Sequence, residues 1–312
     1  MEEITMRIRS LTPLLAGLLA LVPSIGTSVA HAAPAHAPTQ AQPVSYGPQY
    51  AAAHVYLEPG SMPAFVRSWE AAFGGSHLDF VDNVDVTPTP SSALWTFITS
   101  PVGDLSVFDY HTPLPHPFGE ERTGWGVTDV DAALKAARDS GAYELVAPFD
   151  DAIGRNAVIQ FPGGIDTQLW LNFTPPKLPE LTTVPENRVY VTAGTLRPFL
   201  SSYLRFTRGR VVDDQLAADA AEVGETGRMH RISITSQFGK TVVFVTDGHL
   251  PNPYGHEVTG YQVSDLDSTV AKATATGAQV VAEPHTANGR TSAVLKFPGG
   301  YIAEVHQDAG VS

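Results

Sequence analysis

The sequence predicts an α+β protein built from four similar βαβββ modules that form two tandem domains. The letters "FPGG" begin at Phe161 and again at Phe297, 136 residues later. The stretch "PHPFGEERTGWGVTDVD" from Pro115 also aligns without a gap on "PNPYGHEVTGYQVSDLD" from Pro251. Within each half, a short apolar strand, a helical stretch and further strand-like runs occur twice. A period of this length indicates a duplicated structural unit.

Each quarter opens with a short apolar strand, and the four strands read "HVYLE", "GWGV", "RVYV" and "GYQV". In the second quarter Val130, Leu134 and Ala137 follow helical spacing, and Gly141 is placed to end the helix. The fourth quarter repeats this pattern with Leu266, Val270, Ala273 and Gly277. Phe65, Trp69 and Ala72 give the first quarter a similar stripe, and Phe199, Tyr203 and Phe206 give one to the third. Strand-like runs follow each helix, so the order βαβββ is predicted four times.

The spacing of the repeat and the prolines set the domain boundaries. We expect one domain at residues 50–172 and a second at 187–308, joined by a proline-rich linker at 173–186. Early residues match at an offset of 134 and later ones at 136, which predicts a two-residue insertion near Asp213 to Thr226.

Composition limits the partners. The chain has 312 residues, 43% of them apolar and 16% charged, which is enough for two domains with their own cores. The formal net charge of −13 would repel nucleic acid and anionic membranes, so a small neutral or cationic ligand is expected instead. There is no cysteine, which excludes disulfides and cysteine-based sites. The oligomeric state stays open.

The N-terminal segment has the pattern of an export signal. Arg7 and Arg9 precede an apolar run at residues 14–22, and "AHA" at residues 30–32 fits a cleavage site. We expect a signal peptide at residues 1–32 that is removed after Ala32, a flexible tether at 33–49, and a secreted or periplasmic mature protein. The apolar run is too short to span a membrane, which takes about 20 residues.

The chain resembles the vicinal oxygen chelate superfamily, which includes glyoxalase I, extradiol dioxygenases and bleomycin-resistance proteins. The similarity lies in residues 54–75, 124–142, 260–278 and 297–307, which match the superfamily's opening strand, "V-x-D" turn, helix and closing "PGG" strand. The resemblance implies that paired modules curl around a cavity with their helices outside. Four modules would then enclose two pockets, one in each glyoxalase-like domain.

In the metal-dependent members of that superfamily, ligands come from the first and last strands of the paired modules. In the first domain these positions hold His54, Asp109 or a neighbour, Arg122 and Gln168. In the second domain they hold Arg188, Val245, Val258 and Glu304, with His256 and His306 two residues from a ligand position. The resemblance therefore implies a divalent ion (Zn, Fe, Mn or Ni) at His54 with Gln168, or at Glu304 with His306 or His256. The alternative is that no cofactor is bound.

Four further residues have two interpretations. Arg122 and Arg188 cannot ligate a cation, but they could bind a substrate carboxylate or form structural ion pairs. Trp125 and Tyr261 occupy matched positions and could stack on a ligand or belong to the core.

Two main function classes follow. The first is an exported, metal-dependent glyoxalase-like enzyme with lyase, isomerase or dioxygenase chemistry, in which Glu304 or Gln168 relays a proton. The second is a non-catalytic protein that binds or sequesters a small molecule between modules. A structural protein is a third reading. The sequence contains no G-x-S-x-G elbow, P-loop, H-E-x-x-H or dinucleotide-binding motif.

Overall fold

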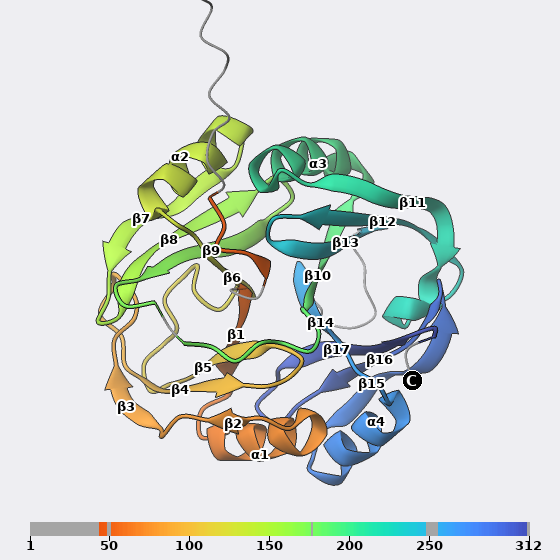
Figure 1. Ribbon diagram of the computed structural model, residues 1–312, viewed down its shortest axis with the longest axis horizontal. Helices are drawn as coiled ribbons and strands as arrows, with labels where there is room; N and C mark the ends of the chain where they lie inside the picture. Colours follow the sequence, from red (N-terminus) through yellow and green to blue (C-terminus); the bar gives the residue numbers. More distant parts are fainter. Residues whose placement is uncertain (1–43, 49–50, 176, 248–254, 311–312) are drawn as a thin grey trace, which may run out of the picture. The chain divides into compact units, whose positions relative to one another are not determined.

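The computed structural model describes residues 44–48, 51–175, 177–247 and 255–310, which belong to one compact unit spanning residues 42–312 (Figure 1). The predicted signal peptide and most of the predicted tether lie outside the described residues. Among the helices that the structure describes, none has both the length and the apolar character needed to cross a membrane.

The first half of the chain contains two βαβββ modules, as predicted. The first module consists of β1 (Ala51–Leu57), α1 (Met62–Phe73), β2 (Ser76–His77), β3 (Val81–Val84), β4 (Ala93–Thr99) and β5 (Asp104–Tyr110). Its second strand is broken, because β2 and β3 both pair with β4. The second module consists of β6 (Thr123–Gly126), α2 (Val130–Ser140), β7 (Tyr143–Asp150), β8 (Gly154–Phe161) and β9 (Ile165–Asn172).

The second half repeats this order with one addition. The third module consists of β10 (Glu186–Thr192), α3 (Ala193–Thr207), β11 (Arg210–Asp219), η2 (Ala220–Val223), β12 (Arg228–Ser236) and β13 (Gly239–Thr246). The fourth consists of β14 (Glu257–Gln262), α4 (Leu266–Ala275), β15 (Gln279–Ala287), β16 (Arg290–Lys296) and β17 (Ile302–Asp308). The short 3₁₀ helix η2 lies inside the segment where the repeat offset predicts an insertion.

Two modules that follow each other in sequence combine into one curled sheet (Figure 1). The first sheet has the order β2-β4-β5-β1-β6-β9-β8-β7, and the second has the order β11-β12-β13-β10-β14-β17-β16-β15. The modules join where their opening strands pair antiparallel, as at Ala53 with Thr123 and at Arg188 with Val258. Each opening strand also pairs in parallel with the closing strand of its own module.

Aspartate side chains cap the N-termini of α2 and α4, and a predicted glycine ends α2. The side chain of Asp129 accepts a hydrogen bond from the backbone N–H of Ala132 at the start of α2, and Asp265 does the same with Ser268 at α4. Gly141 ends α2 with a φ of 97°, a left-handed conformation that glycine adopts without strain.

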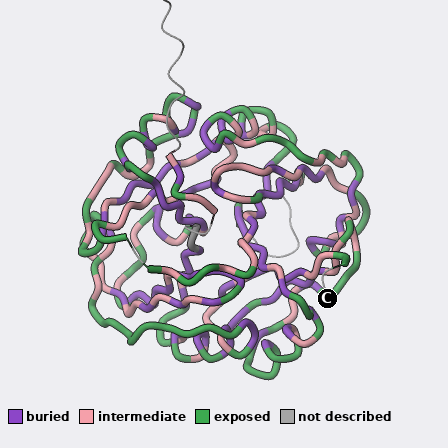
Figure 2. Tube along the Cα trace, viewed as in Figure 1, coloured by how far each residue is buried: buried purple, intermediate pink, exposed green. Residues whose placement is uncertain are grey.

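Both large hydrophobic cores contain residues from both sheets (Figure 2). In the first core, Phe65 and Trp69 of α1 pack with Tyr261, Phe297 and other residues of the fourth module. In the second core, residues of the second module pack with Phe199 and other residues of the third module. Helix α1 contacts α4, and α2 contacts α3. The sheets thus form in sequence order, whereas the helix-side cores join the first module to the fourth and the second to the third.

Candidate functional site

A cavity of about 720 Å³ lies against the first sheet. Its wall is rich in aromatic side chains, namely Tyr56, Trp95, Phe97, Phe108, Tyr110 and Trp170. These residues reach the same side because paired residues in a sheet share a face, as His54 does with Ser106 and Tyr56 with Phe108. The Tyr56 and Phe108 rings stack with centroids 5.4 Å apart. A cavity of this size and lining suits a small planar molecule.

Polar groups interrupt the aromatic wall in one chain of hydrogen bonds. The amide nitrogen of Gln168 donates to Asn156 Oδ1 at 2.9 Å, and the amide nitrogen of Asn156 donates to Asp151 Oδ2 at 2.9 Å. Asp151 in turn accepts from the backbone N–H groups of Ile153 and Gly154. This chain fixes the orientation of Gln168 on the cavity wall.

His54 lies on the cavity wall above Gly124 and is 5% exposed. Its Nδ1 lies 3.5 Å from Oε1 of the fully buried Glu121, which also accepts a hydrogen bond from the Tyr56 hydroxyl. A Cβ atom at Gly124 would lie 2.5 Å from His54 Nε2 and 3.1 Å from Trp170 Nε1, so glycine is needed for both rings to fit. Sequence reasoning identified His54 but missed Glu121.

Carboxylates outnumber cations around this cavity. Asp85, Asp104 and Asp151 line it together with the single lysine Lys177. Burial raises the pKa of Asp104 to about 6, although a backbone hydrogen bond from Ser100 partly lowers it. The cavity therefore disfavours anionic ligands.

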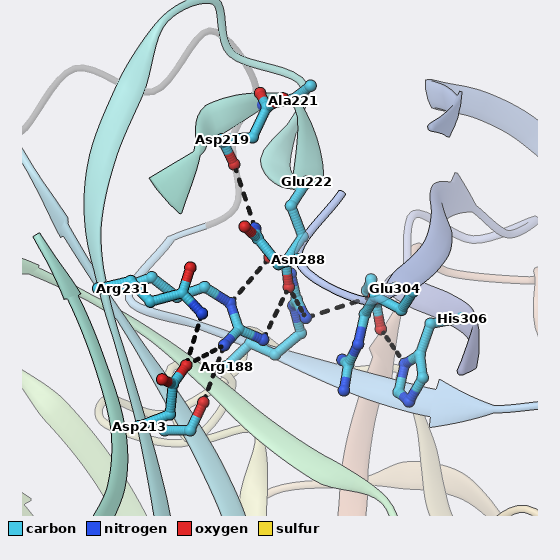
Figure 3. A network of polar contacts seen from close by, with 12 residues as sticks. Arg188, Asp213, Asp219, Ala221, Glu222, Arg231, Asn288, Glu304 and His306 are labelled. Carbon is cyan, nitrogen blue, oxygen red and sulfur yellow. Dashed lines mark hydrogen bonds and ion pairs between the residues drawn. The ribbon is translucent and has the colours of Figure 1, made fainter. Parts of the chain in front are cut away.

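The corresponding face of the second sheet is occupied by protein side chains. The fully buried guanidinium of Arg188 lies between three carboxylates (Figure 3). Its Nη1 is 3.0 Å from Glu186 Oε1, 3.2 Å from Glu222 Oε1 and 3.3 Å from Glu304 Oε1. Arg188 also lies over the Phe244 ring, 4.7 Å from its centroid. The Arg188 guanidinium therefore occupies the centre of this face of the second sheet.

Further charged groups complete the network. Arg231 donates to Glu222 at 2.8 Å, Arg290 donates to Glu186 at 2.6 Å, and Asn288 donates to Glu222 at 2.7 Å. Burial alone would raise the pKa of Glu222, but Arg188 and Arg231 hold it below its ordinary value.

His306 is also part of this network, with its Nδ1 2.7 Å from Glu304 Oε2. Burial lowers the pKa of His306, but the charge of Glu304 reverses this effect and the net direction is upward.

The helix η2 covers the same face with apolar contacts. Val223 packs with Tyr190, Val242, Phe244, Val258 and other residues in a separate hydrophobic cluster. Glu222, the neighbouring residue, reaches Arg188 and Arg231. Helix η2 therefore contributes both an apolar side chain, Val223, and a carboxylate, Glu222, to this face of the second sheet.

The two sheets differ in how well they could hold a divalent metal. In the first sheet, His54 and Gln168 line the cavity, but Arg122 is not a ligand and Asp109 accepts hydrogen bonds from the backbone of Gly60 and Met62 instead. Two ligand side chains do not make a typical site. In the second sheet, ligand atoms of Glu186, Glu304 and His306 lie within 4.8 Å of one another, a spacing compatible with one cation.

The charge balance of the second sheet does not favour that cation. The three carboxylates of Glu186, Glu222 and Glu304 are already matched by the guanidinium groups of Arg188, Arg231 and Arg290. A divalent ion added beside Arg188 would leave two uncompensated positive charges in a buried space, which is costly. The spacing of the ligand atoms would allow a divalent ion, but the charge balance would allow it only if Arg188 moved away.

The remaining candidate residues lie away from the cavity. Trp125 and Tyr261 are both core residues: Trp125 stacks on Phe238 at 4.3 Å, and Tyr261 meets Trp69 edge to face at 4.9 Å. Neither can stack on a ligand in the cavity, because their strand positions point to the helix side.

Arg122, Arg188 and His256, which the sequence offered as substrate or metal contacts, do not line the cavity either. Arg122 is half-buried outside the cavity wall, where its backbone carbonyl accepts from His54 N–H, and Arg188 is enclosed by its ion pairs. His256 is exposed, and it does not join Glu304 and His306.

Comparison with known proteins gives a fold assignment. No protein-family model matches the chain, and no curated protein matches it. Several solved structures, however, have a similar fold. A mutant of 4-hydroxymandelate synthase from Streptomyces coelicolor is 16% identical, with 87% of this chain and 94% of that chain covered and a TM-score of 0.59. A Mn(II)-bound glyoxalase from Novosphingobium aromaticivorans is 9% identical, with 86% and 85% covered and a TM-score of 0.52.

The 2,3-dioxygenase LapB from Pseudomonas sp. KL28 is a further similar structure, 9% identical, with 84% of this chain and 93% of that chain covered and a TM-score of 0.52. All three belong to the vicinal oxygen chelate superfamily. The chain therefore has the vicinal oxygen chelate fold, and the predicted α+β class with four βαβββ modules is confirmed.

Proposed function

We propose that the protein binds a small aromatic molecule in the cavity of the first sheet and that the second sheet serves as a structural centre. The observation that carries the proposal is the contrast between the two faces. One encloses about 720 Å³ behind aromatic side chains, and the other is filled by the Arg188 network and η2. An export signal at residues 1–32 would make this an extracytoplasmic binding function.

Three features of the cavity support this ligand class. Several aromatic side chains line the wall, and stacked or edge-on contacts with a planar ligand stabilise binding. Exposed apolar residues, among them Leu78 and Val81, lie at its rim and line it as well. The polar side chains of Asp151, Asn156 and Gln168 are fixed by hydrogen bonds, which suits a site that orients one ligand.

A second candidate function is metal-dependent lyase, isomerase or dioxygenase chemistry, favoured by the grouping of Glu186, Glu304 and His306. A bound divalent ion would act there as a Lewis acid. In this reading Arg188 would have to leave its three carboxylates before the ion could enter. The structural neighbours include a Mn(II)-bound glyoxalase, which keeps this candidate open to test.

Ligand binding in the presence of a chelator separates the two functions. The purified protein is titrated with 2-naphthol and indole by calorimetry, with and without EDTA, and its unfolding temperature is followed. A binder is stabilised by about 2.7 kcal/mol at a ligand concentration of 100 times Kd, with or without chelator. Stabilisation that disappears with EDTA, together with stoichiometric metal by elemental analysis, would support the metal-dependent alternative.

Two substitutions of aromatic residues test whether the ligand binds in this cavity. Trp170→Ala removes part of the cavity wall and is expected to weaken 2-naphthol binding at least about tenfold, equal to about 1.4 kcal/mol. Tyr143→Ala is the matched control, because Tyr143 is 62% exposed on β7 and lies outside the cavity. Equal affinity in the two variants would remove the cavity from the proposal.

A further inference from the structure

Two ring nitrogens face the same small space in the cavity. His54 Nε2 and Trp170 Nε1 both lie within 3.1 Å of the point that a Cβ atom of Gly124 would occupy. The described residues form no hydrogen bond with either nitrogen, and both side chains line the cavity. One ligand atom placed on the cavity side of Gly124 can therefore reach both nitrogens, since hydrogen bonds of this kind span about 2.7–3.2 Å.

Glu121 determines which proton form of His54 meets that atom. The carboxylate Oε1 of Glu121 lies 3.5 Å from Nδ1 of His54, and the Glu121 side chain is fully buried. At 3.5 Å the two atoms are too far apart for a hydrogen bond, and Nδ1 has no other hydrogen-bond partner among the described residues. The carboxylate beside this buried nitrogen favours a proton at Nδ1 over a lone pair. Nε2 then carries a lone pair and faces the space beside Gly124. The Tyr56 hydroxyl donates to the same Glu121 oxygen and holds it in place.

The pair presented to a ligand is thus one acceptor, His54 Nε2, and one donor, Trp170 Nε1–H. A hydroxyl group matches this pair, because it can donate one hydrogen bond and accept another. A carbonyl or ether oxygen cannot donate to His54, and an ammonium group cannot accept from Trp170. Gln168, the strand partner of Gly124, also lines the cavity, and its amide nitrogen donates to Asn156.

We propose that the cavity selects an uncharged aromatic molecule through one hydroxyl group, which donates to His54 Nε2 and accepts from Trp170 Nε1–H. Glu121 is the positioning residue that fixes the His54 tautomer. This inference rests on the proposed binding function and names its ligand class.

Charge narrows the class further. The carboxylates of Asp85, Asp104 and Asp151 line the cavity against the single cation of Lys177. A ligand carboxylate or phosphate would meet this excess of negative charge and would be repelled. The oxygen held by His54 and Trp170 therefore belongs to a neutral hydroxyl.

Matched probes test the hydroxyl directly. Calorimetry compares 2-naphthol with 2-methoxynaphthalene, which lacks the donor, and with 2-naphthoate, which carries a charge. We expect 2-naphthol to bind at least about tenfold more tightly than the methyl ether, because a lost hydrogen bond leaves a buried partner unpaired. In His54→Phe the two compounds should bind about equally, and in Trp170→Phe the preference for 2-naphthol over the methyl ether should decrease. Both variants keep an aromatic ring but lack the nitrogen.

The two possible failures give different results. If 2-naphthol and the methyl ether bind equally to the wild-type chain, the cavity binds aromatic molecules but the hydroxyl inference is wrong. If neither binds, the binding function itself is wrong. Tighter binding of 2-naphthoate than of 2-naphthol would overturn the assignment of a neutral ligand.

The tautomer provides a readout that a structural role for Glu121 would not move. Nitrogen-15 spectra of the histidine rings, assigned with the help of His54→Phe, report which ring nitrogen is protonated. We expect the Nδ1–H form for His54 in the wild-type chain and a shift toward the Nε2–H form in Glu121→Gln, with a smaller preference for 2-naphthol.

Glu120→Gln is the matched control, since Glu120 pairs with the exposed His116 instead. It should leave the His54 spectrum unchanged. A wild-type ring that carries its proton on Nε2, or on both nitrogens, would overturn the inference whether or not Glu121→Gln folds.

Discussion

The two sheets have the same strand order, yet one encloses a cavity and the other encloses ion pairs. At matched positions of the opening strands, the first sheet has His54 and the second has Arg188. At matched positions of the closing strands, Gln168 and Trp170 correspond to Glu304 and His306. A few side chains at equivalent backbone positions therefore decide whether a face stays open to a ligand.

The glycines at the centre of each sheet show how similar the backbones are. Gly124 leaves room for His54 and Trp170, and Gly260 leaves room for Arg188, Glu186 and Glu304. Two buried glutamates also correspond: Glu121 contacts His54 beside the cavity, whereas Glu257 accepts a hydrogen bond from Thr123 between the sheets. The two halves keep the same backbone arrangement, but the side chains at the matched positions differ in chemistry.

The largest expected effect comes from removing the cation of the second sheet. Arg188→Leu leaves Glu186, Glu222 and Glu304 near one another without the guanidinium that now lies between them. Breaking a buried ionic group in this way costs about 3–5 kcal/mol of unfolding free energy. Urea unfolding measures the loss. Arg138→Ala, which breaks an exposed pair with Glu144, should change stability by less than about 1 kcal/mol.

A second test concerns the diverged glutamates. Burial raises the pKa of Glu257 to about 8, although the hydrogen bond from Thr123 partly lowers it. Because the folded pKa lies above the ordinary value of 4.5, the folded state binds more protons between these two values, and stability falls as pH rises through this window. We expect a loss of about 3 kcal/mol between pH 5 and pH 8 from this group.

Glu257→Gln should remove that component of the pH dependence, because the amide cannot ionise. Unfolding curves recorded across the same pH range measure it for both chains. An unchanged slope in Glu257→Gln would show that the pKa of Glu257 is not raised in the folded protein.

The smallest expected effect concerns the wall of the cavity. Asp104 has a folded pKa of about 6 because of its burial, which the Ser100 backbone offsets only in part. Its ionised form is therefore unfavourable, and stability falls as pH rises from about 4 to about 6. Asp104→Asn should stabilise the protein by up to about 1 kcal/mol at pH 8 and leave it unchanged at pH 4.

Thermal unfolding at the two pH values measures this difference. Asp79→Asn, at an exposed position, should change neither value. A destabilising effect of Asp104→Asn at pH 8 would mean that the carboxylate makes a favourable contact in the folded protein.

The sequence predicted the module order because hydrophobic spacing and a long internal repeat are local signals. The stripe of Val130, Leu134 and Ala137 and the cap at Gly141 could be read directly. The pairing of α1 with α4 could not, because contacts between distant segments leave no periodic pattern. Trp125 and Tyr261 were correctly seen as equivalent, but the sequence could not say that they face the cores.

The candidate site was predicted less completely. His54, Gln168, Glu304 and His306 were identified through the resemblance, whereas Glu121 and Glu222 were missed. Glu222 lies in η2, inside the segment where the repeat offset predicts a two-residue insertion, so the repeat gave no matched residue to point to it. Glu121 was not singled out, although its match with Glu257 in the repeat was a signal that could have identified it.

A crystal structure grown with both 2-naphthol and MnCl₂ tests the central contrast most directly. We predict density for 2-naphthol in the first sheet, with its hydroxyl between His54 and Trp170, and no anomalous manganese peak beside Arg188. A manganese ion bound by Glu186, Glu304 and His306, with Arg188 displaced and the first cavity empty, would contradict the account.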